Sequence, residues 1–184
     1  MKLTKRVSDY IKNSAEYIND NNFTYLYNDM WVLMIAKKFN SEDIGEFTTA
    51  LLDAGIDVIK YLKFIPAFWM CADTTYTGHF IPSHIEGVSI GAFMDSSVEE
   101  IDFGINCKQI SESACSGCNY LDTVTLHPNL EHIGVHAFYG CDDLHEITFT
   151  GTREQWLKIE KTPNWNRGAK NLSIINCTDG KVHI

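Results

Sequence analysis

The sequence predicts an α+β fold, a short β-solenoid in which each turn of about 23 residues contributes one strand. Three observations support this prediction. Apolar positions recur at a fixed step between residues 79 and 149, helical spacing dominates the first 70 residues, and the recurrence stops after Phe149. We therefore expect an N-terminal helical cap at 1–70, repeats at 71–149, and a C-terminal helix-plus-hairpin cap at 150–184.

The first 70 residues have the spacing of amphipathic helices. Apolar side chains recur three and four positions apart over 7–18 and again over 23–34. A third apolar stripe follows the candidate N-cap Ser41. A short fourth helix is expected over 58–64, because Pro66 prevents its continuation. Repeat arrays need covered ends, so these helices are expected to shield the first turn of the solenoid.

The central stretch contains one unit three times, over 80–100, 103–123 and 126–146. Two sets of apolar residues recur at a step of 23: Ile101, Val124 and Ile147, and also Phe80, Phe103, Leu126 and Phe149. Alternation along a strand turns both sets into the core and their neighbours outward. We expect strands at 98–103, 121–126 and 144–149, after an irregular first strand within 74–80. The second half of each unit turns back around the core.

The repeat also explains most of the six cysteines. Cys118 and Cys141 occupy the same repeat position, and Cys107 and Cys115 stand where the other copies have large apolar residues. Free cysteine behaves as a small apolar side chain, so we expect these four in the core. The Cys115–Cys118 spacing also suits a redox or zinc motif, but the sequence has no second CxxC pair.

The pattern changes after Phe149. Thr152 and Gln155 can form a capping box for a short helix that carries Trp156. Strands are expected over 172–177 and 181–184, joined by a Thr-Asp-Gly turn. Among the tryptophans, Trp165 has the weakest support for a core position, since it lies in a polar loop.

The units IGVHAFYGCDDLHEITF and VSIGAFMDSSVEEIDF resemble the BspA-like (Treponema-type) leucine-rich repeat, whose pattern is I-G-x-x-A-F-x-G-C-x-x-L-x-x-I-x-I followed by I-P. Ile81-Pro82 keeps the second element, and the resemblance covers about residues 79–180. It implies a curved leucine-rich-repeat solenoid that binds proteins or surface ligands, without shared catalytic residues and with Trp165 in a structural role. Short intracellular versions with a helical N-terminus are similar to bacteriophage proteins, which implies an accessory protein acting on a bacterial host factor.

The net charge of −9 is concentrated in the repeats. Residues 79–149 have a balance of −10, against −2 for residues 1–78 and +3 for residues 150–184. An acidic solenoid disfavours direct nucleic-acid binding and attracts a protein with a basic surface. The need to keep an apolar array soluble would explain the same charge.

We expect the exposed face of the strands to bind a protein partner. The candidate partner-binding residues are those that alternation places on this face or just beyond it: His79, Glu100, Asp102, Thr123, Thr125, His127, Glu146 and Thr148. The predicted function is a non-enzymatic protein-binding module, plausible as a phage accessory protein that binds or inhibits a host defence protein. A nucleic-acid mimic that blocks a DNA- or RNA-binding protein is an alternative. A metal- or carbohydrate-dependent enzyme is a less favoured one.

The sequence predicts no catalytic residue, no cofactor and no metal site. Glu100 and Asp102 would project from one side of a strand about 7 Å apart, a separation that a carboxylate pair can use. An open sheet, however, lacks the water-excluded cleft that tunes such a pair. A metal site joining His79 to Asp102, or His127 to a neighbour, competes with the simpler interpretation of solvated surface histidines.

The sequence favours a cytoplasmic protein, in the host cytoplasm if a phage encodes it. The opening MKLTKRVSDY has no apolar signal region. The longest apolar run, 30–36, is far too short to span a bilayer, so no membrane partner is expected. The sequence leaves the oligomeric state open.

Overall fold

The structure is a computed structural model that describes residues 63–65, 69 and 78–184. It concerns the compact unit that runs from Lys63 to Ile184. The helical cap predicted for 1–70 lies outside the described residues except near its end. There, Phe64 and Ile65 form strand β1 (Phe64–Ile65), so the fourth helix predicted over 58–64 is wrong at Phe64.

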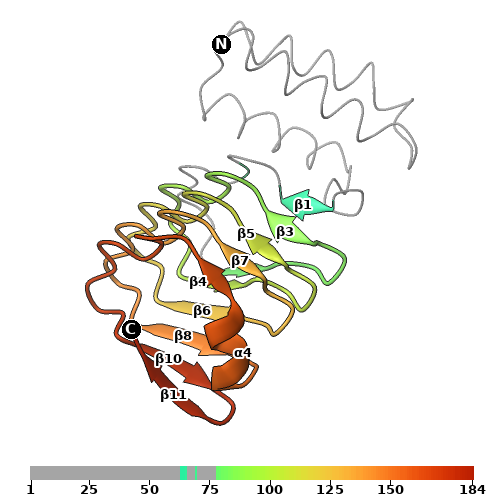
Figure 1. The fold of residues 1–184 in the computed structure, drawn as a ribbon. Coiled ribbons are helices and arrows are strands. Elements are labelled where there is room, and N and C mark those ends of the chain that lie inside the picture. The colour runs from blue at the N-terminus through green and yellow to red at the C-terminus, as the bar shows by residue number, and fades with distance from the viewer. Residues whose placement is uncertain (1–62, 66–68, 70–77) are drawn as a thin grey trace, which may run out of the picture. The chain divides into compact units, whose positions relative to one another are not determined.

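The described chain winds into a solenoid with a parallel sheet on each of two sides (Figure 1). The long-strand sheet has the order β2-β4-β6-β8-β10-β11, and β11 alone runs antiparallel to its neighbour. Its strands are β2 (Gly78–Phe80), β4 (Glu100–Asp102), β6 (Thr123–Leu126), β8 (Glu146–Phe149), β10 (Ile174–Cys177) and β11 (Gly180–His183). The first four lie within the predicted ranges and are shorter.

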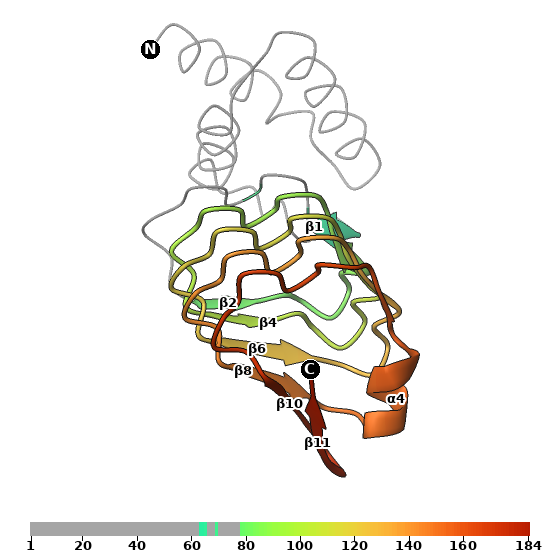
Figure 2. The same cartoon turned by 60° about the vertical axis from the view of Figure 1, so that its left-hand side comes forward.

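Figure 2 shows the long-strand sheet, and a second sheet of two-residue strands follows the return path of the chain (Figure 1). This short-strand sheet has the order β1-β3-β5-β7-β9, and its members after β1 are β3 (Gly87–Val88), β5 (Gln109–Ile110), β7 (His132–Ile133) and β9 (Glu160–Lys161). Each turn thus contributes a second, shorter strand besides the predicted one. Two residues are too few for alternation to be visible in a sequence.

The register of the first turn differs from the predicted one by one residue. Phe80 pairs with Asp102 on the neighbouring strand, and the Ile81 N–H donates to the Asp102 carbonyl at 2.8 Å. Phe103 makes the equivalent bond to the Thr125 carbonyl in the next turn. Ile81 therefore belongs to the buried column of Phe103, and it is 0% exposed against 65% for Phe80. The first step is 22 residues, because the turn after Ser96 is one residue shorter than its counterparts.

Apolar columns that run from turn to turn fill the core. The predicted inward residues Ile101, Val124 and Ile147 are buried, as are Phe103, Leu126 and Phe149. Val98, Leu121 and Leu144 form a further buried column two residues before the long strands β4, β6 and β8. Full burial of each aliphatic or aromatic side chain contributes about 1.5–3 kcal/mol, so the stacked columns supply most of the driving force for coiling.

The turn side of the solenoid, between the short and the long strands, depends on left-handed backbone conformations. Gly117, Gly140 and Gly168 have φ values of 73°, 65° and 89°, and Asp95 takes the equivalent place in the first turn at 57°. Glycine adopts this region at no steric cost. Gly117 also has no Cβ, which would meet the Asp95 carboxylate of the preceding turn.

In the middle of this turn side, the hydrogen bonds that join neighbouring turns run in one direction along the solenoid, whereas Ser111 and Asp122, at its margins, donate to the preceding turn. From each turn, alternate N–H groups donate to carbonyls of the following turn. The nine donors are Gly91, Phe93, Asp95, Ser113, Cys115, Gly117, His136, Phe138 and Gly140. These bonds satisfy backbone groups that the short strands leave unpaired.

The four cysteines predicted to be core residues are buried and unpaired. Two of them also bridge turns, since Cys118 Sγ donates to the Phe93 carbonyl at 2.9 Å and Cys141 Sγ to the Cys115 carbonyl at 3.0 Å. Burial raises the pKa of Cys107 to about 12 and raises the pKa of Cys115 well above its usual value. The raised pKa disfavours the thiolate that redox or zinc chemistry requires at Cys107 and Cys115, whereas hydrogen bonds from Cys115 and Ser96 lower the pKa of Cys118.

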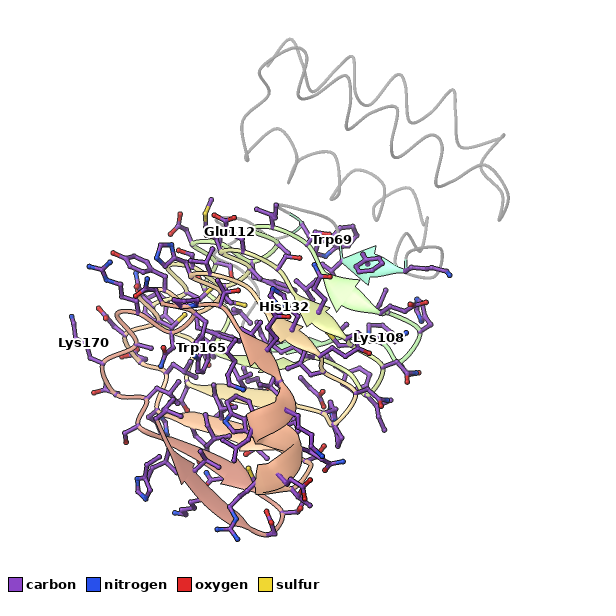
Figure 3. All side chains as sticks on the ribbon, in the orientation of Figure 1. Trp69, Lys108, Glu112, His132, Trp165 and Lys170 are labelled. Atoms are coloured by element: carbon purple, nitrogen blue, oxygen red, sulfur yellow. The ribbon has the colours of Figure 1, made fainter. Side chains whose placement is uncertain are left out.

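The C-terminal segment packs two tryptophans at the end of the core, Trp156 against Phe149 and Trp165 against Trp156. Helix α4 (Arg153–Lys158) begins with the predicted capping box of Thr152 and Gln155. Trp156 is buried on this helix, and its ring meets Phe149 and Trp165 at centroid distances of 5.6 and 6.1 Å. Trp165 is only 9% exposed and lies on the last turn (Figure 3). Its core position agrees with the structural role that the family resemblance implied.

Candidate partner-binding face

The long-strand sheet brings six of the eight predicted binding residues onto one face. The register pairs Glu100 with Thr123 and Thr123 with Glu146, which forms one outward column. It pairs Asp102 with Thr125 and Thr125 with Thr148, which forms a second column. These side chains are half-buried to exposed, whereas the residues between them are buried. The period of two along each strand produces this division.

His79 does not belong to these columns. The register pairs it with Ile101, an inward position, and places Phe80 beside Asp102 instead. The sequence prediction assigned His79 to the Asp102 column because a step of 23 residues was applied to a turn of 22. The corrected outward column therefore begins with an exposed aromatic ring, Phe80, followed by Asp102.

His127 lies just beyond β6 and links three successive turns. Its Nε2 is 2.8 Å from Asp102 Oδ1, and its Nδ1 is 3.0 Å from Thr150 Oγ1. The same Asp102 oxygen accepts the Gly104 N–H at 2.8 Å. The side chain of His127 is mostly covered, at 16% exposure. The network thus fixes both Asp102 and His127 at the carboxyl ends of the strands.

An acidic hollow of about 720 Å³ lies at the other end of the strands, where they begin. It flanks the buried Leu121–Leu144 column. The acidic hollow is lined by Glu99, Glu100, Tyr120, Asp122, Thr123, Asp143, His145 and Asn171. Four of these are carboxylates, and neither lysine nor arginine is among them. The backbone ties its walls together, because Asp122 N–H donates to the Glu99 carbonyl and His145 N–H to the Asp122 carbonyl.

His145 provides the second histidine–carboxylate pair of the face. Its Nδ1 lies 2.5 Å from Asp122 Oδ1 and 3.3 Å from the Asp143 carbonyl. Both partners of the pair are about half exposed. The acidic face, as we call it below, consists of the two outward columns on β4, β6 and β8, the acidic hollow and His127.

Basic side chains end the acidic face at the C-terminal edge of the sheet. Asn176 pairs with Thr148 on one side and with Lys181 on the other, so the second outward column ends in a lysine. By the same register, His183 continues the first column next to Ile174. The carboxylates on the long strands themselves are Glu100 and Asp102 of β4 and Glu146 of β8.

The metal-ligating types of side chain do not form a cluster among the described residues. Within them, no group of three or more histidine, cysteine, aspartate or glutamate side chains is arranged to hold a metal ion. Across the same part of the chain, no helix has the length and apolar character to cross a bilayer.

A comparison with protein-family models identifies the family of this chain. The model described as BspA type leucine rich repeat region (6 copies) matches residues 66–159, about half of the chain. This chain belongs to the BspA-type leucine-rich repeat family. The match covers strands β2 to β8 and helix α4, and it includes every residue of the acidic face except Asn171.

One solved structure supports the fold of this BspA-type protein. It is that of a leucine rich cell surface protein from Faecalibacterium prausnitzii A2-165, at 20% sequence identity and a TM-score of 0.51. The likeness covers 64% of this chain and 30% of that chain, so this chain spans a minor part of its structural relative. No curated protein matches.

Sequence reasoning missed part of the face of this BspA-type protein. Tyr120, Asp143 and Asn171 were not among the predicted residues, although they line the acidic hollow. Each stands immediately before a buried leucine of one column, Leu121, Leu144 or Leu172. An exposed position next to a recurring buried one is the signal that would have identified them.

Proposed function

We propose that this protein is a non-enzymatic binding module whose acidic face captures a protein with a basic surface. One observation carries the proposal: carboxylates stand on adjacent turns across the face, and they converge on a hollow without lysine or arginine. Membership of a leucine-rich repeat family agrees with a protein-interaction role at the level of the family.

The charge pattern specifies the chemistry of the partner. Six carboxylates of the face lie on three neighbouring turns: Glu99, Glu100, Asp102, Asp122, Asp143 and Glu146. Adjacent strands are about 4.8 Å apart, so charges at equivalent positions on neighbouring turns fall within about one Debye length of each other at physiological salt. Such a patch accelerates association with a basic protein and loses strength as salt is added. The exposed rings of Phe80 and Tyr120 offer apolar contact at the two margins.

The narrower form of the proposal is a bacteriophage accessory protein that acts in the cytoplasm of a bacterial host. In this form the acidic face binds, and by binding inhibits, a host defence protein. The support for it is the likeness of a short repeat array with a predicted helical N-terminus to phage proteins, together with the acidic charge.

A three-way capture experiment tests the binding function. The wild type is compared with a face variant, Glu99→Gln/Glu100→Gln/Asp122→Asn, and with a matched control, Glu112→Gln/Glu131→Gln/Glu160→Gln. The control removes three exposed carboxylates that do not line the acidic hollow. Capture is performed at low salt from a lysate of the natural host, and bound proteins are quantified by mass spectrometry.

We expect a protein that the wild type and the control retain and that the face variant loses. Equal recovery by all three proteins would contradict the assignment to this face, and recovery of nothing above background would contradict the binding function itself. Once a partner is known, competition with DNA or RNA separates a nucleic-acid mimic from a general scaffold, since a mimic cannot bind together with nucleic acid.

A further inference from the structure

The two histidines of the acidic face are each paired with one of its carboxylates. His127 Nε2 contacts Asp102 Oδ1 at 2.8 Å, and His145 Nδ1 contacts Asp122 Oδ1 at 2.5 Å. The first pair lies at the carboxyl ends of the long strands and the second at their amino ends. Protonation of both rings would therefore reduce the negative charge at opposite margins of the same surface.

From this geometry we infer that the acidic face is a pH-sensitive docking surface, which holds a basic partner at neutral pH and releases it in mild acid. The inference rests on the proposed function. Histidine is the side chain whose charge ordinarily changes between pH 5 and 8. Aspartate and glutamate side chains ordinarily titrate near pH 4, below the range in which histidine ordinarily gains its charge.

The surroundings of His127 allow both protonation states. Asp102 on β4 is the charged group that the structure pairs with it, and Thr150, after β8, lies within hydrogen-bond distance of its second nitrogen. In the neutral ring, Nε2–H donates to Asp102 while Nδ1 accepts the Thr150 hydroxyl proton. In the charged ring both nitrogens donate, and the Thr150 oxygen accepts. The pair can thus change its charge without breaking contacts.

His145 faces more negative charge. Asp122 and Asp143 contact it from the segments before β6 and β8, and Glu99 and Glu100 line the same hollow from the start of β4. Tyr120 and Asn171 are the other neighbours that line the hollow. A proton on His145 is placed among four carboxylates, where it opposes the entry of a lysine or arginine side chain from the partner.

The size of the effect follows from Coulomb's law. A unit charge about 7 Å from a bound cation, in high dielectric, changes affinity by about threefold. Two such charges change it by about tenfold. The effect should be largest at low ionic strength, because both pairs are partly exposed and salt screens them.

A fluorescent decalysine peptide serves as the probe. Its affinity is measured by anisotropy at about 20 mM salt, at pH 8 and pH 5.5, for the wild type, for His127→Gln/His145→Gln and for the control His136→Gln. His136 packs against Tyr139 in a tilted arrangement on the turn side, away from the face. Glutamine can still donate to Asp102 and Asp122 and has no charge to gain, and circular dichroism at both pH values verifies that each variant is folded.

We expect the wild type and the His136→Gln control to bind about tenfold more weakly at pH 5.5, and the double variant to change by less than about twofold. Loss of pH dependence in the wild type, or its full retention in the double variant, overturns the inference. If the double variant fails to fold, the exposed-site single variant His145→Gln is expected to lose about half of the logarithmic shift. Absence of decalysine binding at pH 8 would instead overturn the proposed function.

Discussion

The register of the first turn predicts that mutations at two adjacent apolar residues, Phe80 and Ile81, have different effects on stability. Ile81 is fully buried in the Phe103 column, whereas Phe80 projects outward beside Asp102. Replacement of a buried isoleucine by alanine costs about 2–5 kcal/mol, because the transfer free energy of the lost methyl groups adds to that of the cavity. The Phe80→Ala change removes a side chain that is 65% exposed and should cost less than about 1 kcal/mol. Ile81→Ala should therefore lower the free energy of unfolding by about 3 kcal/mol and Phe80→Ala hardly at all.

Urea unfolding followed by circular dichroism measures the free energy of both variants. Because the turns of a solenoid can open separately, hydrogen exchange of the Ile81 amide provides a local readout. This amide is bonded to the Asp102 carbonyl at 2.8 Å and should lose protection in the Ile81→Ala variant. A larger loss of unfolding free energy in Phe80→Ala than in Ile81→Ala would refute this register. It would instead support a step of 23 residues, which places Phe80 in the Phe103 column.

Three further outcomes are expected. Trp165→Ala should lower the free energy of unfolding by about 3–5 kcal/mol in thermal or urea unfolding. Leu157→Ala, at an exposed position of α4, should be nearly neutral, and equal effects of the two changes would contradict the buried position of Trp165. In the native protein at pH 8, peptide-resolved iodoacetamide labelling should modify the half-buried Cys177 well before Cys107, whose pKa burial raises to about 12; simultaneous labelling would exclude this difference. Asp179→Asn should lower the melting temperature at pH 7, because the Arg153 N–H that donates to the Asp179 carboxylate lowers the pKa of that group. This stabilisation is present above the ordinary carboxyl pKa and is lost as the pH falls through the pKa of Asp179 in the folded protein. The difference in melting temperature between variant and wild type should therefore shrink below about pH 4.

Recurring apolar positions predicted the solenoid because each turn must bury the same columns against its neighbours. Ile101, Val124 and Ile147 can be identified from the sequence for this reason, and the capping box at Thr152 predicts α4 from local hydrogen bonding alone. The recurring apolar positions do not predict which of Phe80 and Ile81 is buried. Both are apolar, so the period cannot choose between them, and the deciding feature is a turn shortened by one residue after Ser96.

The acidic hollow could not be predicted for a different reason. Tyr120 and Asn171 are 51 positions apart in the sequence, and only the stacking of turns brings them to one surface. The pairs His127–Asp102 and His145–Asp122 likewise join residues 25 and 23 positions apart. A repeat period indicates which positions share a column, but the distance between neighbouring columns depends on the geometry of the turns.

The one-way hydrogen bonds of the turn side have an electrostatic consequence for the two ends of the array. In ordinary sheets peptide dipoles alternate and nearly cancel. On this side, nine N–H groups from Gly91 to Gly140 point toward the last turn, so their dipoles add as they do in a helix. For this set of nine bonds, the positive pole lies toward the last turn and the negative pole toward the first turn. A carboxylate is favoured beyond the last turn, and a hydrogen-bond donor or a cation is favoured beyond the first turn. Any engineered cap or added turn would have to match this polarity.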